Sequence, residues 1–334
     1  RFYSLAWPST DFLITVIIVL MLCLGGNLIL SGKSDINPAV FIGFLGVLYS
    51  IISPIRDMMK CTFGIRKAMA SVVRLNKILA INDEILNEKK DSISESKEIP
   101  IIAIKDLSFK YDNESVLENI SLQINKGQKV AILGATGSGK STLLSLIIRL
   151  YDDYEGTIQI GGKDIRSYSY NTIRNYITYV PQNPLLLNDS IKNNITLCND
   201  KFSEEDIIRA AKQAEIHDFI TLLPDDYNTI IGDRGCNLSG GQQQGISLTR
   251  AFIKDSPILL IDEGTAALDP ELESNVMSNI INNMNDKTMI IVSHKISTVL
   301  NADYVYVFND GKIIESGNPK ELWQRNGYFR SMAN

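Results

Sequence analysis

Hydrophobic residues form two long blocks near the N-terminus and a series of short blocks in the rest of the 334-residue chain. Residues 12–30 and 36–55 contain no charged side chain, and each run has about the twenty residues that a membrane-spanning helix needs. Two buried helices of a soluble protein are the alternative. Because only residues 31–35 separate the runs, we predict a hairpin of two membrane helices, at about 11–31 and 36–81.

The second helix is expected to extend beyond its apolar run. Residues 56–81 keep helical periodicity but carry several charges, so we interpret them as a continuation of the membrane helix into the cytosol. An independent amphipathic surface helix is the alternative. Residues 82–100 are polar and rich in Lys and Ser, which is typical of a linker. The predicted parts are therefore residues 1–81, a linker at 82–100 and a domain at 101–334.

Short apolar blocks in residues 101–334 predict buried strands next to helical stretches. The run Lys129–Leu133 leads into a glycine-rich loop, and helical residues 141–150 follow it. Ile258–Ile261 is too short for a buried helix and fits a buried parallel strand. Thr288–Val292 is a similar strand-like run, and residues 243–254 are helical. We therefore predict an α/β domain in this part of the chain.

Charge is distributed unevenly along the chain, and the distribution predicts an orientation. Residues 1–81 hold eight Lys or Arg and three Asp or Glu, and most of the basic residues follow Ile55. By the positive-inside rule, the segment after Ile55 is cytoplasmic and residues 31–35 are external. Residues 82–334 hold 25 Lys or Arg and 35 Asp or Glu, a net charge of −10. This acidic domain gives no support for a nucleic-acid partner.

The strongest chemical motif lies in residues 134–142. They are Gly134, Ala135, Thr136, Gly137, Ser138, Gly139, Lys140, Ser141 and Thr142. They match the phosphate-binding pattern G-x-x-x-x-G-K-[ST] between a predicted strand and a predicted helix. Inward-turned backbone amides and the helix N-terminus form an anion site. Lys140 is expected to reach the β- and γ-phosphates of a nucleotide, and Ser141 to bind Mg²⁺. A glycine-rich turn without a ligand is the alternative.

Two carboxylates, Asp262 and Glu263, follow the strand predicted at 258–261. In open α/β sheets, ligands bind at the carboxyl ends of the strands. Asp262 is placed to hold Mg²⁺ through water, and Glu263 to orient or deprotonate the attacking water. Acidic residues also cap helices, so the pair is informative chiefly because it accompanies the phosphate loop.

A second motif, Leu238-Ser-Gly-Gly-Gln242, precedes the helical stretch 243–254. Ser239 is expected to be the N-cap, and the two glycines leave backbone amides open to an anion. An ordinary capped helix is the alternative. This pentapeptide is the signature of the ATP-binding-cassette (ABC) transporters, and residues 101–334 resemble the nucleotide-binding domain of that family. The resemblance implies a P-loop α/β ATPase domain with an antiparallel β subdomain and a helical subdomain.

Further positions match the family pattern in chain order, and the resemblance implies a role for each. Tyr111 would stack on adenine, although a Tyr in a strand is usually a core or rim residue. Gln182 would bind Mg²⁺ and couple its site to the membrane domain. Asp269, in Ala267–Asp269, would cross a dimer interface. His294 would contact the γ-phosphate, although a lone His is more often structural.

The resemblance also implies how many chains form one site. One phosphate loop and one signature per chain imply a homodimer, or a heterodimer with a second half-transporter. The signature of one chain would close over the ATP and Mg²⁺ of the other, through Ser239, Gly240, Gly241 and Gln242. Hydrolysis would reopen the pair. The presence of Glu263, with His294 and Gln182 as the other catalytic candidates, implies a site that hydrolyses ATP.

Two positions depart from the family pattern. Relatives usually carry Arg where this chain has Gly245, and Ala or Ser where it has Gly264. A glycine inside a helix costs about 1 kcal/mol relative to Ala, so Gly245 is expected to loosen the helix behind the signature. Neither departure removes a catalytic group.

The predicted hairpin, linker and ATPase together resemble the C-terminal part of an ABC exporter half-transporter of the lipid and multidrug type. Because the chain begins with Arg, we expect a fragment that holds the last two of six membrane helices. The implied function is ATP-driven export of a lipid, drug or other amphipathic substrate. The implied location is the inner or plasma membrane, as a multi-pass protein with a cytoplasmic ATPase domain. A peptide or toxin exporter, a soluble ABC ATPase of DNA repair or translation, and a nucleotide-binding regulator without turnover are the alternatives.

Overall fold

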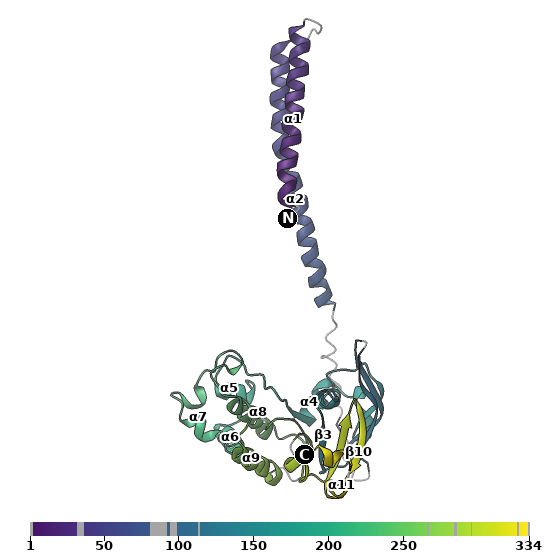
Figure 1. Cartoon of the computed structure of the whole chain (residues 1–334). Helices are drawn as coiled ribbons and strands as arrows, with labels where there is room; N and C mark the ends of the chain where they lie inside the picture. The colour runs from purple at the N-terminus through teal and green to yellow at the C-terminus, as the bar shows by residue number, and fades with distance from the viewer. Residues whose placement is uncertain are drawn as a thin grey trace. The chain divides into compact units, whose positions relative to one another are not determined.

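The computed structural model describes residues 3–31, 37–80, 92–93, 99–112, 114–265, 267–283, 286–294, 296–325 and 327–332. The chain divides into two compact units, Arg1–Asp83 and Glu84–Asn334 (Figure 1). Most of the predicted linker, residues 82–100, lies outside the described residues.

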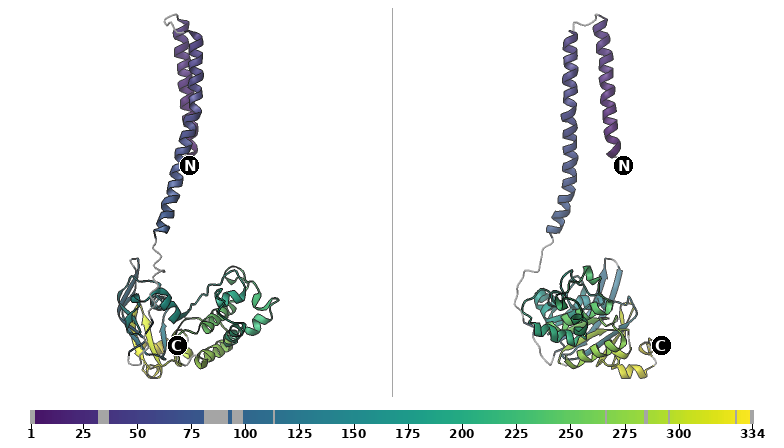
Figure 2. Two further views of the ribbon diagram at one scale, coloured as in Figure 1. Left: turned by 180° about the vertical axis from the view of Figure 1, so that it is seen from behind. Right: turned by 90° about the vertical axis from the view of Figure 1, so that its left-hand side faces the viewer.

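The first unit consists of two helices that run in opposite directions, α1 (Tyr3–Leu30) and α2 (Pro38–Leu79) (Figure 2). α1 begins at Tyr3 rather than near Asp11. The reason is that a charge-free run marks only the apolar part of a helix, and a helix can continue through polar residues beyond that part. α2 continues from its apolar part through the charged segment without a break.

Apolar side chains cover much of the surface of both helices. Among the described residues, Pro38–Ile55 of α2 is the one helical segment long and apolar enough to cross a membrane, with a mean hydropathy of 1.9. The apolar stretch of α1, Ile14–Leu30, is shorter. A Cβ atom at Gly25 of α1 would clash with the ring of Phe41 of α2, so the helices approach each other closely at this level.

The second unit contains two sheets. The smaller sheet is antiparallel, with the order β2–β1–β4–β5. Its strands are β1 (Ile102–Tyr111), β2 (Glu114–Ile124), β4 (Glu155–Ile160) and β5 (Lys163–Asp164). The larger sheet has the order β10–β9–β3–β8–β7–β6. Its strands are β3 (Lys129–Gly134), β6 (Ile177–Val180), β7 (Ile258–Asp262), β8 (Thr288–Val292), β9 (Tyr304–Asn309) and β10 (Lys312–Gly317).

The larger sheet is parallel except for β10, which pairs antiparallel with β9. Every residue of β7 and β8 is buried, as the continuous apolar runs of these strands predict. β3 lies between β9 and β8, and β7 and β6 follow on the β8 side. Because these strands are parallel, the loops after β3, β6, β7 and β8 all start at the same edge of the sheet.

Helices connect the strands and extend the unit to one side. They are α3 (Lys140–Ile147), α4 (Tyr170–Tyr176), α5 (Ile191–Thr196), α6 (Glu204–Gln213), α7 (His217–Thr221), α8 (Gly240–Lys254), α9 (Pro270–Asn283), α10 (Ile296–Val299), α11 (Pro319–Gln324) and α12 (Tyr328–Ser331). α5 to α9 gather beside the sheets (Figures 1 and 2). They share a core with β6 and β7 that includes Ile207, Ile246, Phe252 and Val180, so this helical part is packed onto the larger sheet.

Candidate nucleotide-binding site

The predicted phosphate loop connects β3 to α3 at the carboxyl edge of the larger sheet. Gly139 is the N-cap residue of α3, with φ +95°. A Cβ atom at this position would meet Leu117 Cδ2 at 2.6 Å and the Val116 carbonyl oxygen at 2.9 Å. Backbone angle and space therefore both require glycine. The first amides of α3, which have no partner within the helix, thus lie where such sheets bind ligands.

The Lys140 side chain is folded into its own loop. Its ammonium donates to the carbonyl oxygens of Gly134 at 2.9 Å and Ala135 at 2.7 Å, and lies 3.4 Å from Ser138 Oγ. Burial lowers the pKa of Lys140, while Glu263 and Asp262 act in the opposite direction. The loop therefore holds a desolvated cation whose carbonyl partners can be exchanged for phosphate oxygens, which bind a cation more strongly.

Asp262 ends β7 as a buried carboxylate. It is 3% exposed, and its Oδ2 accepts a hydrogen bond of 3.1 Å from the Tyr179 hydroxyl of β6. Burial raises the pKa of Tyr179, and the neighbouring Asp262 carboxylate raises it further, so the phenol keeps its proton and stays a donor. This bond fixes the orientation of the carboxylate and with it the direction of the second oxygen, Oδ1.

Gln182, Glu263 and His294 meet although they follow three different strands, β6, β7 and β8. Gln182 Nε2 donates to Glu263 Oε2 at 2.7 Å, and His294 Nδ1 lies 3.4 Å from Glu263 Oε1. Glu263 has φ +48°, a left-handed conformation that non-glycine residues adopt rarely and that is concentrated at functional sites. All three candidate catalytic side chains are thus brought together around one carboxylate.

A hollow of about 240 Å³ separates the phosphate loop from this carboxylate. This phosphate-loop hollow is lined by Val116, Thr136, Gly137, Gly139, Lys140, Ser141, Thr142, Gln182 and Glu263. Ser141, Gln182 and Asp262 offer oxygen donors of the kind that Mg²⁺ prefers when phosphates and water complete its shell. Among the described residues, no group of three or more His, Cys, Asp or Glu side chains is arranged to hold a metal ion.

Tyr111 lies outside that lining. It ends β1 and is 40% exposed. Its ring packs edge-on against Phe109, with centroids 4.9 Å apart, and against Tyr151 at 5.4 Å. The two neighbours hold an accessible ring in place, which suits contact with a base rather than with phosphates.

The signature residues lie at the start of α8, apart from the phosphate loop. Ser239 is the N-cap, as predicted. Its Oγ accepts a hydrogen bond of 3.3 Å from the backbone N–H of Gln242, and Gln242 Oε1 accepts one of 2.8 Å from the backbone N–H of Ser239. The cap uses the hydroxyl as an acceptor, so its hydrogen can still be donated.

A second hollow, of about 600 Å³, contains the signature. The predicted residues in its lining are Ser239, Gly240, Gly241, Gln242 and Asp269. No described residue lines both this signature hollow and the phosphate-loop hollow. The structure therefore brings the predicted site residues together in two groups rather than one.

The two glycines that depart from the family pattern are closely packed. A Cβ atom at Gly245 would meet Ile216 Cδ1 at 2.6 Å, and one at Gly264 would meet Val180 Cγ1 at 2.7 Å. α8 continues through Gly245 without a break, and Thr249 Oγ1 donates to the Gly245 carbonyl at 2.8 Å. Gly245 is therefore a packing position rather than a break in the helix.

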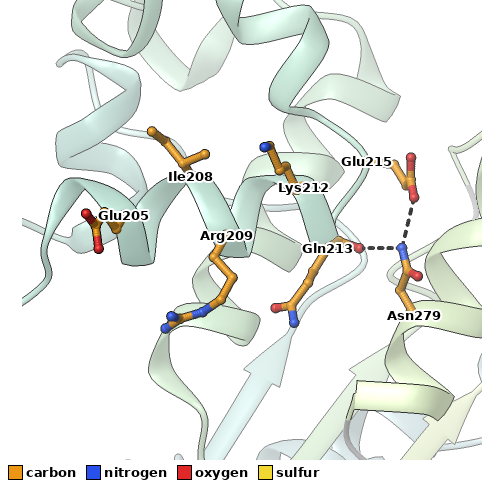
Figure 3. A pocket seen from close by; sticks show the side chains of 7 residues that line it. All are labelled: Glu205, Ile208, Arg209, Lys212, Gln213, Glu215 and Asn279. Atoms are coloured by element: carbon orange, nitrogen blue, oxygen red, sulfur yellow. Dashed lines mark hydrogen bonds between the residues drawn. The ribbon is translucent and has the colours of Figure 1, made fainter.

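A third hollow, of about 580 Å³, lies on the helical part between α6 and α9 (Figure 3). Asn279 of α9 donates to the Gln213 carbonyl at 3.0 Å and to Glu215 Oε1 at 2.9 Å. The lining contains none of the predicted site residues. Glu215 also lines the signature hollow, so Asn279 holds a side chain on the border between the two hollows.

Sequence reasoning missed two residues that contact the predicted ones. Tyr179 bonds to Asp262, and the buried amide of Gln244 reaches backbone atoms of the loops after β6 and β7. Tyr179 lies three residues before Gln182 on a strand, where a polar hydroxyl among apolar residues is a usable signal. Gln244 follows two other glutamines, and the sequence does not indicate which of them points inward.

A strand–loop–helix phosphate site that faces a carboxylate at the carboxyl edge of a mostly parallel sheet defines a P-loop nucleotide-binding domain. Residues 117–266 match a family model described as "ABC transporter". This part of the chain is therefore an ABC transporter ATPase domain, and it has an ATP-binding site. The predicted fold class, an ABC ATPase domain preceded by a helical hairpin, is confirmed.

Relatives and a solved structure extend the similarity over most of the chain. It is 38% identical over 310 residues to an "ATP-dependent lipid A-core flippase" of Desulfotalea psychrophila, which covers 93% of this chain and 54% of the relative. It is 37% identical over 334 residues to the "Beta-(1-->2)glucan export ATP-binding/permease protein NdvA" of Rhizobium etli, and this match covers 99% of this chain and 56% of the relative. The chain thus spans about half the length of the curated relatives it matches.

The solved structure is described as a bacterial Atm1-family ABC exporter with ATP bound. It superposes with a TM-score of 0.74 at 29% identity, covering 96% of this chain and 57% of that one. The similarity therefore includes the helical hairpin as well as the ATPase unit, and it agrees with an ABC exporter of the half-transporter type.

Proposed function

We propose that this chain is the ATP-hydrolysing part of a membrane ABC exporter and couples ATP binding and hydrolysis to substrate export. The observation that carries the proposal is the convergence of Lys140, Gln182 and Glu263 on one hollow, while the signature residues line another. A binding site for phosphates, a carboxylate that can act on water, and a separate closing surface are the parts that such a cycle requires.

In the proposed bound state, the amides of residues 134–142 and Lys140 hold the phosphates, and Tyr111 stacks on the adenine. Ser141 and Gln182 would hold Mg²⁺ directly, and Asp262 would hold it through water. When bound, Mg²⁺ neutralises part of the charge on the β- and γ-phosphates. The Tyr179 bond to Asp262 Oδ2 would orient the other carboxylate oxygen toward that water.

Glu263 is the proposed general base. Its Oε2 accepts the 2.7 Å hydrogen bond from Gln182, which sets its orientation, and its Oε1 faces His294. In the bound state Glu263 would accept a hydrogen bond from the attacking water, and His294 would turn its exposed ring to the γ-phosphate. The 3.4 Å contact between His294 and Glu263 is loose, which leaves the ring available for a second partner.

The signature hollow is proposed to close over the nucleotide of a second chain. The N-terminus of α8 and the Ser239 hydroxyl would contact the γ-phosphate in trans, and Asp269 would cross the interface. Two chains would then enclose two nucleotides, and hydrolysis would release the contact. A homodimer is proposed because this chain alone holds both kinds of half-site. ATP can shift the open–closed equilibrium only through its higher affinity for the closed state.

We place α1 and α2 in the inner or plasma membrane, with the ATPase unit on the cytoplasmic side. The apolar surfaces of both helices and the basic residues after Ile55 support this placement. The proposed substrate is a lipid or another amphipathic molecule, an assignment supported by relatives named as a lipid A-core flippase and a glucan exporter.

Glu263→Gln tests the proposal. In the full chain in lipid nanodiscs, ATP affinity should stay close to that of the parent, while hydrolysis falls at least about a hundredfold, the scale of a lost general base. The variant should also accumulate as an ATP-bound dimer. Glu271→Gln, on the exposed first turn of α9, is the matched control. Hydrolysis by Glu263→Gln at the parent rate would move the base to His294, the other side chain at this site that can accept a proton.

A further inference from the structure

Gln244 is a buried polar residue that the proposed cycle does not use. It lies on α8 and is 2% exposed. Its Nε2 donates to the Gln182 carbonyl at 3.2 Å and lies 3.5 Å from the Glu263 carbonyl, and its Oε1 accepts from the Ala267 amide at 3.0 Å. One side chain on the signature helix thus contacts the backbone of two catalytic residues and of the segment that leads to Asp269.

The pattern of contacts selects an amide group. A glutamine side chain offers two N–H donors and one acceptor oxygen, and the three backbone partners of Gln244 are two carbonyls and one N–H. Buried backbone groups are costly to leave unpaired. A carboxylate in this place would keep the bond to Ala267 and repel the two carbonyls, and an apolar side chain would lose all three contacts.

The peptide units that Gln244 holds are those of the Gln182–Glu263 pair, whose side chains share the 2.7 Å hydrogen bond. α8 also holds the loop after β6 at a second place, because Arg250 donates to the Leu185 carbonyl at 2.8 Å. At its other end, α8 begins with the capped Ser239. Within one chain, the signature and the Gln182–Glu263 pair are therefore linked through α8 and the hydrogen bonds of Gln244 and Arg250.

We propose that Gln244 is a positioning residue: it couples the position of the signature helix to the geometry of Gln182 and Glu263 in the same chain. The inference rests on the proposed function, in which the signature binds the nucleotide of a second chain. Engagement of the signature with one nucleotide would then be sensed at the catalytic pair that serves the other. Gln244 would thus make the two sites of the dimer act together.

Gln243 provides a matched control on the same helix. Its Nε2 donates to the carbonyl oxygens of Gly235 at 3.0 Å and Leu238 at 3.2 Å. It is also a glutamine that holds backbone carbonyls, but those carbonyls belong to Gly235 and to Leu238, the first residue of the signature, and not to the catalytic pair. Replacing either glutamine by Met keeps length and apolar contact and removes only the polar bonds.

The experiment compares Gln244→Met, Gln243→Met and the parent in the full chain in lipid nanodiscs. Gln244→Met should lower kcat about tenfold, with ATP affinity within about threefold of the parent, since positioning affects the transition state more than ground-state binding. The Hill coefficient for ATP hydrolysis should fall toward one. Gln243→Met should change kcat by less than about threefold.

A double-mutant cycle separates positioning from a general loss of stability. In a Gln182→Ala background, Gln244→Met should lower kcat by less than about threefold more, because residues that act as one unit are not additive. Independent effects at the two positions, equal losses for the two Met variants, or an unchanged kcat in Gln244→Met would each overturn the proposal. If Gln244→Met does not fold, Gln244→Asn, which keeps a neutral amide but is one methylene too short to reach all three partners, is measured with the same expectations. A parent chain that hydrolyses no ATP would instead refute the proposed function itself.

Discussion

The phosphate-loop hollow and the signature hollow differ in the chemistry of their linings. The first has a volume of about 240 Å³ and presents the ammonium of Lys140, hydroxyl side chains and the carboxylate of Glu263. The second has a volume of about 600 Å³ and presents glycine backbone, the Ser239 hydroxyl, the carboxylates of Glu215 and Asp269, and apolar side chains such as Phe219 and Leu272. Of the described residues in the second lining, none is Lys or Arg.

This difference indicates that the two hollows contribute differently to binding a nucleotide. A triphosphate carries several negative charges, and a buried cation such as Lys140 contributes more to holding it than neutral donors do. The signature hollow offers the partial positive charge of the α8 N-terminus instead, roughly half an elementary charge. We therefore expect ATP affinity to depend on the phosphate-loop hollow. Closure of the two chains, and the hydrolysis that follows closure, should depend on the signature hollow.

Removal of the cation should have the largest effect on ATP binding. Lys140→Ala is expected to weaken ATP binding by about ten- to a hundredfold, because losing a charged hydrogen bond costs roughly 1.5–3 kcal/mol. Equilibrium titration with a fluorescent ATP analogue measures this. Lys192→Ala, which removes a surface lysine 3.5 Å from Glu204, should leave affinity unchanged. Equal ATP affinities for Lys140→Ala and the parent would show that residues 134–142 do not form the phosphate-binding loop.

A change in the signature hollow should leave binding intact and stop turnover. Ser239→Arg is expected to keep ATP affinity within about threefold of the parent and to abolish hydrolysis, because it blocks the closing surface and not the cation site. Mixed with Lys140→Ala chains, it should regain hydrolysis, since in a trans dimer both defects fall on one site and the other site is intact.

Hydrolysis by the mixed Ser239→Arg and Lys140→Ala chains can be suppressed by coupling between the two sites. Crosslinking therefore provides the decisive test of the trans arrangement. Cysteines replace Ser239 on one chain and Thr136 on another, in a background whose four native cysteines are serine. An ATP-dependent crosslink between chains is expected. A crosslink formed only within one chain would contradict the head-to-tail arrangement and the division of work between the two hollows.

The smallest expected effect concerns the packing of the signature helix. Gly245→Ala gains up to about 1 kcal/mol of helix propensity. It also places a Cβ atom 2.6 Å from Ile216 Cδ1, an overpacking that costs about 1–3 kcal/mol. We expect a net loss of thermal stability in the full chain, measured by scanning fluorimetry. Ile216→Val, which removes Cδ1, should destabilise the parent but stabilise the Gly245→Ala variant.

That reversal of sign is the diagnostic result. Ile216→Val on its own should cost about 0.5–1.5 kcal/mol, the usual effect of deleting one buried methyl group. If Ile216→Val lowers stability equally in both backgrounds, Gly245 and Ile216 do not compete for the same space. The position of the loop before α7 would then have to be set by other contacts.

Much of the phosphate-loop hollow could be predicted from the sequence alone. Residues 134–142 are consecutive, and the curl of the loop follows from glycine freedom and the start of a helix, both of which are local properties. The Ser239 cap was predictable for the same reason, because it involves residues three positions apart. The buried strands β7 and β8 were likewise evident as short apolar runs between polar segments.

The contacts between distant segments depended on the tertiary structure. Gln182, Glu263 and His294 meet because β6, β7 and β8 are neighbours in a parallel sheet. The inward direction of Gln244 depends on how α8 packs, and a run of three glutamines does not specify it.

The role of Gly245 was also decided by tertiary packing. It became clear only from the side chain of Ile216, which lies far away in the chain and close in space. In this protein, local backbone geometry and the burial pattern determined which motifs and elements form. Sheet order and side-chain packing decided which of their residues touch, because those contacts join segments whose separation along the chain carries no information about their distance in space.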